Sequence, residues 1–231
     1  MLRPDDYFIK AFDFQHFIYL GIFLLVFVLM LFNMRRIQEK PEPILKATLI
    51  LSILQQILLY GTYLWEGRTL GLDYVLAEGL PLHISRISSI LGILWLIKRS
   101  PWLMDILFFF SFFAYGSFFY PSRVHPITHP IGWSFLINHV ITILLPIFAI
   151  LIFKWRPTIQ SLKRAITAYV IYVFVALLAN QLTGGNYFYL TKRIAFHSWP
   201  LWQYTAIVLV LGLLGFPLVY GITKLFRKRN I

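Results

Sequence analysis

The chain has 231 residues, of which 59% are hydrophobic and only 13% are charged. Soluble domains carry about 25% charged residues, so this chain lacks the polar surface that would coat a globule. A net charge of +12 would indicate nucleic-acid binding in a soluble protein, but in a membrane protein the position of the basic residues matters more. Because cysteine is absent, disulfides, thiolate metal sites and thiol nucleophiles are excluded.

Seven apolar segments approach or exceed the roughly 20 residues that a transmembrane helix needs. The sequence therefore predicts an all-α, polytopic transmembrane helix bundle that forms one domain over residues 1–231. Pro146 should kink the fifth segment, and Pro217 could kink the seventh. The first segment is interpreted as a retained helix, because no signal-peptide cleavage site follows it. In chain order, the predicted spans are Phe14–Phe32, Ile44–Tyr63, Pro81–Ile97, Trp102–Tyr120, Ile131–Phe153, Arg164–Leu182 and Leu201–Phe226.

Basic residues gather at alternate connections between these segments, and this pattern predicts the orientation of the chain. One set of segment ends holds Arg35, Arg36, Lys40, Lys46, Lys98, Arg99, Lys154, Arg156, Lys163, Arg164, Lys224, Arg227, Lys228 and Arg229. The other set holds the acidic residues Asp5, Asp6, Asp13, Glu66, Asp73 and Glu78. We therefore expect a multi-pass protein of the cell membrane, with its N-terminus outside and its C-terminus in the cytoplasm. The basic tail is expected to meet anionic lipid headgroups at the cytoplasmic face, and no nucleic acid.

All histidines fall in the predicted outer half, which indicates a shared polar pocket. They are His16, His83, His125, His129, His139 and His197. His139 lies deepest, about 12 Å below the start of its span at 1.5 Å per residue. A histidine at this depth needs a partner or a wet cavity, and the adjacent Asn138 has the same need. The alternative for both residues is an interhelical hydrogen bond that joins two helices.

His83 and Arg86 lie three residues apart at the start of the third span and share a helix face. The planar guanidinium of Arg86 would suit a phosphate or carboxylate, and His83 would serve as a general base or nucleophile. The alternative is that Arg86 extends to the headgroups at the interface. Further polar residues at a comparable depth would contribute to substrate binding. They are Gln56, Tyr115, Asn138 and Asn180.

Two pairs nearer the surface carry weaker signals. Asp13 and His16 could form a carboxylate–imidazole pair, although a solvated helix start explains them equally well. His125 and His129 resemble a metal pair, but the prolines that follow them deny them a shared helical face. The sequence has no His-Glu-x-x-His cluster, nucleophile elbow or glycine-rich phosphate loop. We therefore expect no metal and no cofactor, and the pattern identifies no nucleophilic serine.

Several short motifs, taken in order, resemble the YwaF-like family of bacterial integral membrane proteins. They are Leu80-Pro81-Leu82-His83, Asn138-His139, Gly185-Asn186-Tyr187-Phe188-Tyr189-Leu190 and Trp199-Pro200-Leu201-Trp202-Gln203-Tyr204. The likeness covers nearly the whole chain. That family is distantly similar to eukaryotic multispan acyltransferases that remodel ether phospholipids with a Pro-Cys-His motif and a later histidine.

The resemblance implies roles for individual residues. Pro81 and His83 match the Pro-Cys-His motif, and His139 is the counterpart of the later histidine. The cysteine position holds Leu82, so an acyl-cysteine intermediate cannot form here. Acyl transfer would instead need a histidine nucleophile, an acceptor hydroxyl activated by histidine, or a serine.

Three classes of function remain open. The first is a lipid acyltransferase or hydrolase at the outer leaflet, with His139 and His83 as base and acid and Arg86 on the headgroup. The second is a transporter, scramblase or lipid-binding protein that uses the same pocket without chemistry, although the sequence shows no inverted repeat. The third is a sensor or a partner subunit. A retinal protein is excluded, because the last span has no lysine before Lys224 at its end.

Overall fold

The computed structural model describes residues 8–194, 196 and 198–229, so the predictions for Asp5, Asp6 and His197 fall outside the described residues. Helices are the regular elements of the described part, and the all-α prediction is confirmed. The elements are α1 (Phe14–Phe32), α2 (Met34–Glu39), α3 (Glu42–Leu70), α4 (Leu72–Glu78), α5 (Ile84–Lys98), α6 (Pro101–Phe119), α7 (Pro130–Ile152), α8 (Ile159–Thr183), the 3-10 helix η1 (Tyr187–Tyr189) and α9 (Leu201–Arg229).

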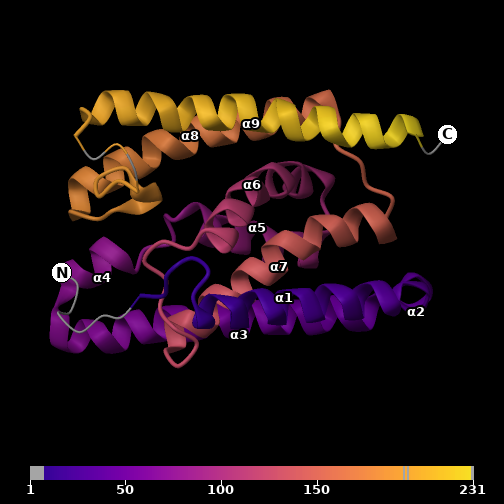
Figure 1. The fold of residues 1–231 in the computed structure, drawn as a ribbon, viewed down its shortest axis with the longest axis horizontal. Helices are drawn as coiled ribbons and strands as arrows, with labels where there is room; N and C mark the ends of the chain where they lie inside the picture. Colours follow the sequence, from indigo (N-terminus) through magenta and orange to yellow (C-terminus); the bar gives the residue numbers. More distant parts are fainter. Residues whose placement is uncertain (1–7, 195, 197, 230–231) are drawn as a thin grey trace.

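Six helices in the described part of the chain are long and apolar enough to cross a membrane: α1, α3, α6, α7, α8 and α9. The remaining predicted span corresponds to α5, which has only 15 residues. At 1.5 Å per residue it extends about 22 Å, less than the roughly 30 Å of a hydrocarbon core. It nevertheless runs antiparallel to α3 and α6, so the seven segments alternate in direction (Figure 1).

This alternation separates two ends of the bundle, which we call the α4 end and the α2 end after the short helices found there (Figure 1). An ion pair at 3.6 Å between Arg99 and Glu42 joins the close of α5 to the start of α3 at the α2 end. At the α4 end, Arg123 pairs with Glu78 at 3.6 Å. Segments that are far apart in the sequence are thus tied together at both ends.

Two helix bounds differ most from the prediction, each for a local reason. Helix α3 continues to Leu70 and stops where Gly71 adopts a positive φ of 87°. Helix α8 begins before Arg164, because Thr158 and Ser161 cap each other's backbone N–H groups. Pro146 and Pro217, where kinks were predicted, both lie inside continuous helices.

Helix α6 lies at the centre of the bundle and contributes to three hydrophobic cores. Its Phe109 packs with α8 and α9, its Phe118 with α1 and α7, and its Met104 with α3, α5 and α7. All three side chains are buried. A helix that is apolar on every side is suited to such an interior position.

One carboxylate sets the register of α6 against α8 near the α2 end. Asp105 is buried, and its oxygens accept hydrogen bonds from Ser161 Oγ and Arg164 Nη1, both at 2.7 Å. A buried charge is expensive unless it is paired and hydrogen-bonded, so sliding either helix by one turn would be unfavourable.

We expect Gly212→Ala to destabilise the protein, because a Cβ at this position of α9 would overlap the Tyr169 ring of α8. Overpacking of this kind lowers the free energy of unfolding by about 1–3 kcal/mol. The matched control is Gly221→Ala in the same helix, where an added Cβ meets nothing within 4 Å. Thermal unfolding in detergent micelles, followed by tryptophan fluorescence, should show a lower midpoint for the first variant only. Equal midpoints would contradict the close packing of α8 against α9.

Candidate functional site

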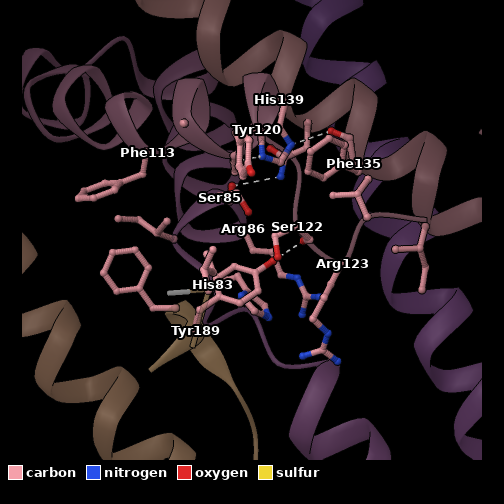
Figure 2. Close-up of a pocket in the computed structure, with 18 of the residues that line it drawn as sticks. His83, Ser85, Arg86, Phe113, Tyr120, Ser122, Arg123, Phe135, His139 and Tyr189 are labelled. Atoms are coloured by element: carbon pink, nitrogen blue, oxygen red, sulfur yellow. Dashed lines mark hydrogen bonds between the residues drawn. The ribbon is translucent and has the colours of Figure 1, made fainter. Parts of the chain in front are cut away.

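A cavity of about 600 Å³ (Figure 2) is lined in part by Tyr74 and Glu78 of α4 and so lies near the α4 end of the bundle. Side chains of α3, α4, α5, α6, α7, η1 and α9 line it, together with the loop that follows α6. Most of its wall is aromatic or aliphatic. The polar side chains in the wall include Tyr63, His83, Ser85, Arg86, Tyr115, Ser117, Arg123, Ser134, Asn138 and His139.

His139 of α7 is buried in this wall, and both of its ring nitrogens have partners. Nδ1 lies 2.8 Å from the carbonyl oxygen of Phe135, and Nε2 lies 2.9 Å from Ser117 Oγ. Because a carbonyl oxygen only accepts, Nδ1 carries the proton, and Nε2 of the neutral imidazole is the acceptor. The Phe135 ring lies 3.9 Å from the imidazole centroid and covers one side of it. The ring is therefore held in one tautomer with its basic nitrogen toward α6.

Ser117 is a site residue that sequence reasoning missed. It lies near the end of α6, lines the cavity and meets His139 across the interface between α6 and α7. Serines in membrane helices commonly bond a carbonyl of the preceding turn, as Ser111 does to the Phe108 oxygen at 2.7 Å. No signal in the sequence distinguishes the two serines, because the histidine lies 22 residues away on another helix.

His83 lines the same cavity from a different element. It is the N-cap residue of α5, where its backbone oxygen accepts hydrogen bonds from the N–H groups of Arg86 and Ile87. Its ring lies against Tyr187 and Tyr189, with centroids 5.3 and 5.9 Å away. Among the described residues, none forms a hydrogen bond with its ring nitrogens. In Figure 2, His83 lies beside Tyr189 and is separated from His139 by Ser85.

Arg86 is buried and is largely engaged by the protein itself. Its Nη1 donates to the carbonyl oxygens of Glu78 and Leu80, at 2.6 and 2.8 Å, and its Nη2 donates to Tyr63 Oη at 2.7 Å. The guanidinium also lies 4.8 Å from the centroid of the Tyr63 ring. These contacts join α3, α4 and α5. Only the remaining N–H groups of Arg86 are available for the predicted binding of a headgroup.

Arg123 is a second cation in the cavity wall, and the sequence did not single it out. It lies in the loop after α6 and pairs with Glu78 at 3.6 Å, while its Nε is buried without a hydrogen-bond partner. Its position beside His83 in the wall brings positive charge to the α4 end of the cavity.

The other predicted binding residues divide into two groups. Asn138 and Tyr115 line the cavity, where Asn138 donates to the Ser85 carbonyl oxygen at 3.2 Å. Gln56 and Asn180 do not line it. Gln56 donates to Ser89 Oγ at 2.7 Å, which joins α3 to α5.

Asn180, in turn, holds the turn that follows α8. Its Nδ2 donates to the carbonyl oxygen of Tyr187 at 3.0 Å, and its Oδ1 accepts from the Tyr187 N–H at 2.6 Å. Tyr187 closes the loop between α4 and α5 by donating to the Leu76 oxygen and accepting from the Leu80 N–H. Burial raises the pKa of Tyr187 to about 12, so its hydroxyl remains a donor at physiological pH.

The remaining described histidines lie outside the group formed by His83 and His139. His16 is buried against α6, where it contacts the Phe118 oxygen, and Asp13 caps α1 through the His16 backbone N–H at 2.8 Å. Asp13 and His16 therefore mark a helix start rather than a carboxylate–imidazole pair. His125 lines the cavity and stacks on His129 at 4.3 Å between centroids.

We expect Arg86→Met to lower the free energy of unfolding by about 3 kcal/mol, because three acceptors at the meeting of α3, α4 and α5 lose their donor. The control is Arg68→Met on the exposed face of α3, which should change stability by less than about 0.5 kcal/mol. Thermal unfolding in detergent micelles tests both variants. If they melted alike, Arg86 would not be a structural clamp.

Comparisons with known proteins agree with a multispan membrane protein. An uncharacterized protein of Treponema pallidum (strain Nichols) is 26% identical over 169 residues, which cover 72% of this chain and 67% of that protein. No solved structure matches. A sequence model of the TMEM164 family matches residues 11–222, which include the cavity-lining residues from Leu59 to Leu211. The chain therefore belongs to the TMEM164 family.

Proposed function

We propose that the cavity binds a membrane lipid and catalyses transfer or hydrolysis of its acyl ester, with His139 as the general base. The single observation that carries this proposal is the position of His139. Its basic nitrogen lies in the wall of a mostly apolar cavity inside a membrane bundle. Acyl esters are the reactive groups that a membrane supplies at this depth, and a neutral imidazole is suited to move the proton that their cleavage requires.

The boundaries of the cavity support a lipid as the substrate. Tyr115 of α6 and Leu211 of α9 line it, yet 36% and 56% of their surfaces are exposed on the flank of the bundle. The cavity therefore reaches the side of the molecule where acyl chains would lie. A lipid could place its tails against this flank and its ester near His139, while its headgroup stayed at the α4 end.

The surroundings of His139 support a role as base. The Phe135 carbonyl oxygen accepts from Nδ1–H, which orients the ring and leaves Nε2 as the nitrogen that can take a proton. The rings of Phe118 and Phe135 flank it, with centroids 6.0 and 3.9 Å away, and limit access of water. General base catalysis of this kind contributes about 10²–10⁴-fold to a rate.

His83 would serve as the second acid or base. Its ring faces the same cavity, and its nitrogens make no hydrogen bond within the described part of the chain. Arg123, with its unpartnered Nε, and the remaining donors of Arg86 would attract an anionic headgroup. These cations lie at the α4 end, where the predicted orientation places the outer leaflet of the cell membrane.

We expect His139→Gln to reduce product formation about 100-fold or more, because among the described residues no other base faces Ser117. His83→Gln should reduce it by a smaller factor. The control is His129→Gln, which changes an imidazole outside the cavity wall and should leave the rate within about twofold. The protein would be reconstituted in nanodiscs of a phospholipid with isotope-labelled acyl chains, and fatty acid, lysolipid and transfer products measured by mass spectrometry.

An inactive wild-type protein that moved labelled lipid between the leaflets of vesicles would overturn the proposal. That result would favour the alternative in which the protein is a transporter, scramblase or lipid-binding protein that uses the cavity without chemistry.

A further inference from the structure

We infer that Ser117 is the nucleophile of this site and that the acyl group passes through an ester on its Oγ. The inference rests on the proposed acyl-transfer function and deepens it, since it names the covalent intermediate. A base alone could activate a water or a lipid hydroxyl directly. A hydroxyl of the protein, held against that base inside the cavity, offers a two-step route instead.

The directions of the hydrogen bonds make the Ser117 hydroxyl the donor and His139 Nε2 the acceptor, as nucleophilic activation requires. The Nδ1–H of His139 is committed to the Phe135 carbonyl oxygen, so Nε2 can only accept in the neutral ring. The Ser117 hydroxyl therefore directs its hydrogen to Nε2 over 2.9 Å. A nucleophile–base pair is recognised by this distance and by a third group that orients the base. Here the third group is the Phe135 carbonyl oxygen rather than a carboxylate.

The competing structural explanation is a serine that only satisfies its own helix. Ser117 Oγ also lies 3.3 Å from the Ala114 oxygen, but this contact is longer than the one to His139. Ser111, on the same helix, shows the purely structural arrangement, with its hydroxyl 2.7 Å from the Phe108 oxygen and no place in the cavity wall. The two serines thus differ in partner and in surroundings.

No other described serine in the wall has an imidazole partner. Ser134 accepts a hydrogen bond from Gln55 Nε2 at 2.6 Å. Ser85 lines the cavity through α5, but none of the described histidines bonds to it. Leu82 occupies the position where the resemblance to lipid acyltransferases places a cysteine. It packs against the core between α6 and α8 and does not line the cavity.

The proposed reaction balances with these two side chains, one lipid ester and an acceptor that is either water or an alcohol. Ser117 Oγ attacks the ester carbonyl carbon, an Oγ–C bond forms, and the hydroxyl proton moves to His139 Nε2. The tetrahedral intermediate then breaks the bond between the carbonyl carbon and the glycerol oxygen, which takes the proton and leaves as the lysolipid alcohol. In the second step, water or an acceptor alcohol gives its proton to Nε2 and attacks the acyl-serine. The C–Oγ bond breaks, and Oγ recovers the proton.

The first test measures the covalent intermediate directly. Wild-type protein in nanodiscs of an isotope-labelled diacyl phospholipid should show an acyl adduct on the peptide that contains Ser117. Ser117→Ala should lose the adduct and at least 100-fold of the turnover. Ser111→Ala, the matched control on α6, should keep both. Because the chain has no native cysteine, Ser117→Cys should carry the acyl group as the only thioester in the protein, which neutral hydroxylamine would release.

The second test separates the nucleophile from the substrate. A long-chain alkyl fluorophosphonate should phosphonylate Ser117, and His139→Gln should slow this labelling at least tenfold. Unchanged turnover in Ser117→Ala would overturn the nucleophile and leave the proposed function standing. Labelling of Ser117 without lipid turnover would support the nucleophile and count against acyl transfer between lipids. Wild-type protein that showed neither labelling nor turnover would overturn both.

Discussion

The buried guanidinium of Arg86 must have hydrogen-bond acceptors inside this apolar bundle, and the arrangement of α3, α4 and α5 depends on those hydrogen bonds. Arg86 meets that need by donating to two carbonyl oxygens of the α4–α5 connection and to a tyrosine of α3. Irregular backbone at membrane depth is tolerated only where protein covers it and satisfies its hydrogen bonds. In the α4–α5 connection, Arg86 donates to backbone carbonyl oxygens and Tyr187 accepts from the Leu80 N–H. Because these bonds hold the start of α5, they also hold His83 in the cavity wall. Arg86, which the sequence suggested as a headgroup-binding residue, therefore has a structural role in the fold.

Length and hydropathy were sufficient to predict the helical class and most of the helix bounds. They were less informative where local chemistry decides, as at the Thr158 cap of α8 and at α5, whose first turn is replaced by the connection that Arg86 holds. A hydropathy pattern measures how apolar a segment is. It does not measure whether the polar residues beside it are satisfied by their neighbours.

For the candidate site too, the sequence predicted some of the residues and could not identify others. Depth in the sequence predicted that His83 and His139 would face a common pocket, and the structure places both in one cavity. Depth alone could not separate Tyr115, which lines the cavity, from Gln56, which joins two helices. It also could not find Ser117, because helix periodicity gives the face of a residue and not the neighbour that this face meets.

Under the proposed function, different helices would supply the chemistry and the fit to the substrate. Ser117 and His139 belong to α6 and α7, which pack against each other, whereas Val208 and Leu211 of α9 form another part of the cavity wall. A shift of α9 would change the width of the cavity without altering the hydrogen bond between the serine and the histidine. If the proposed function holds, selectivity for acyl-chain length could therefore diverge among family members while Ser117 and His139 kept their geometry.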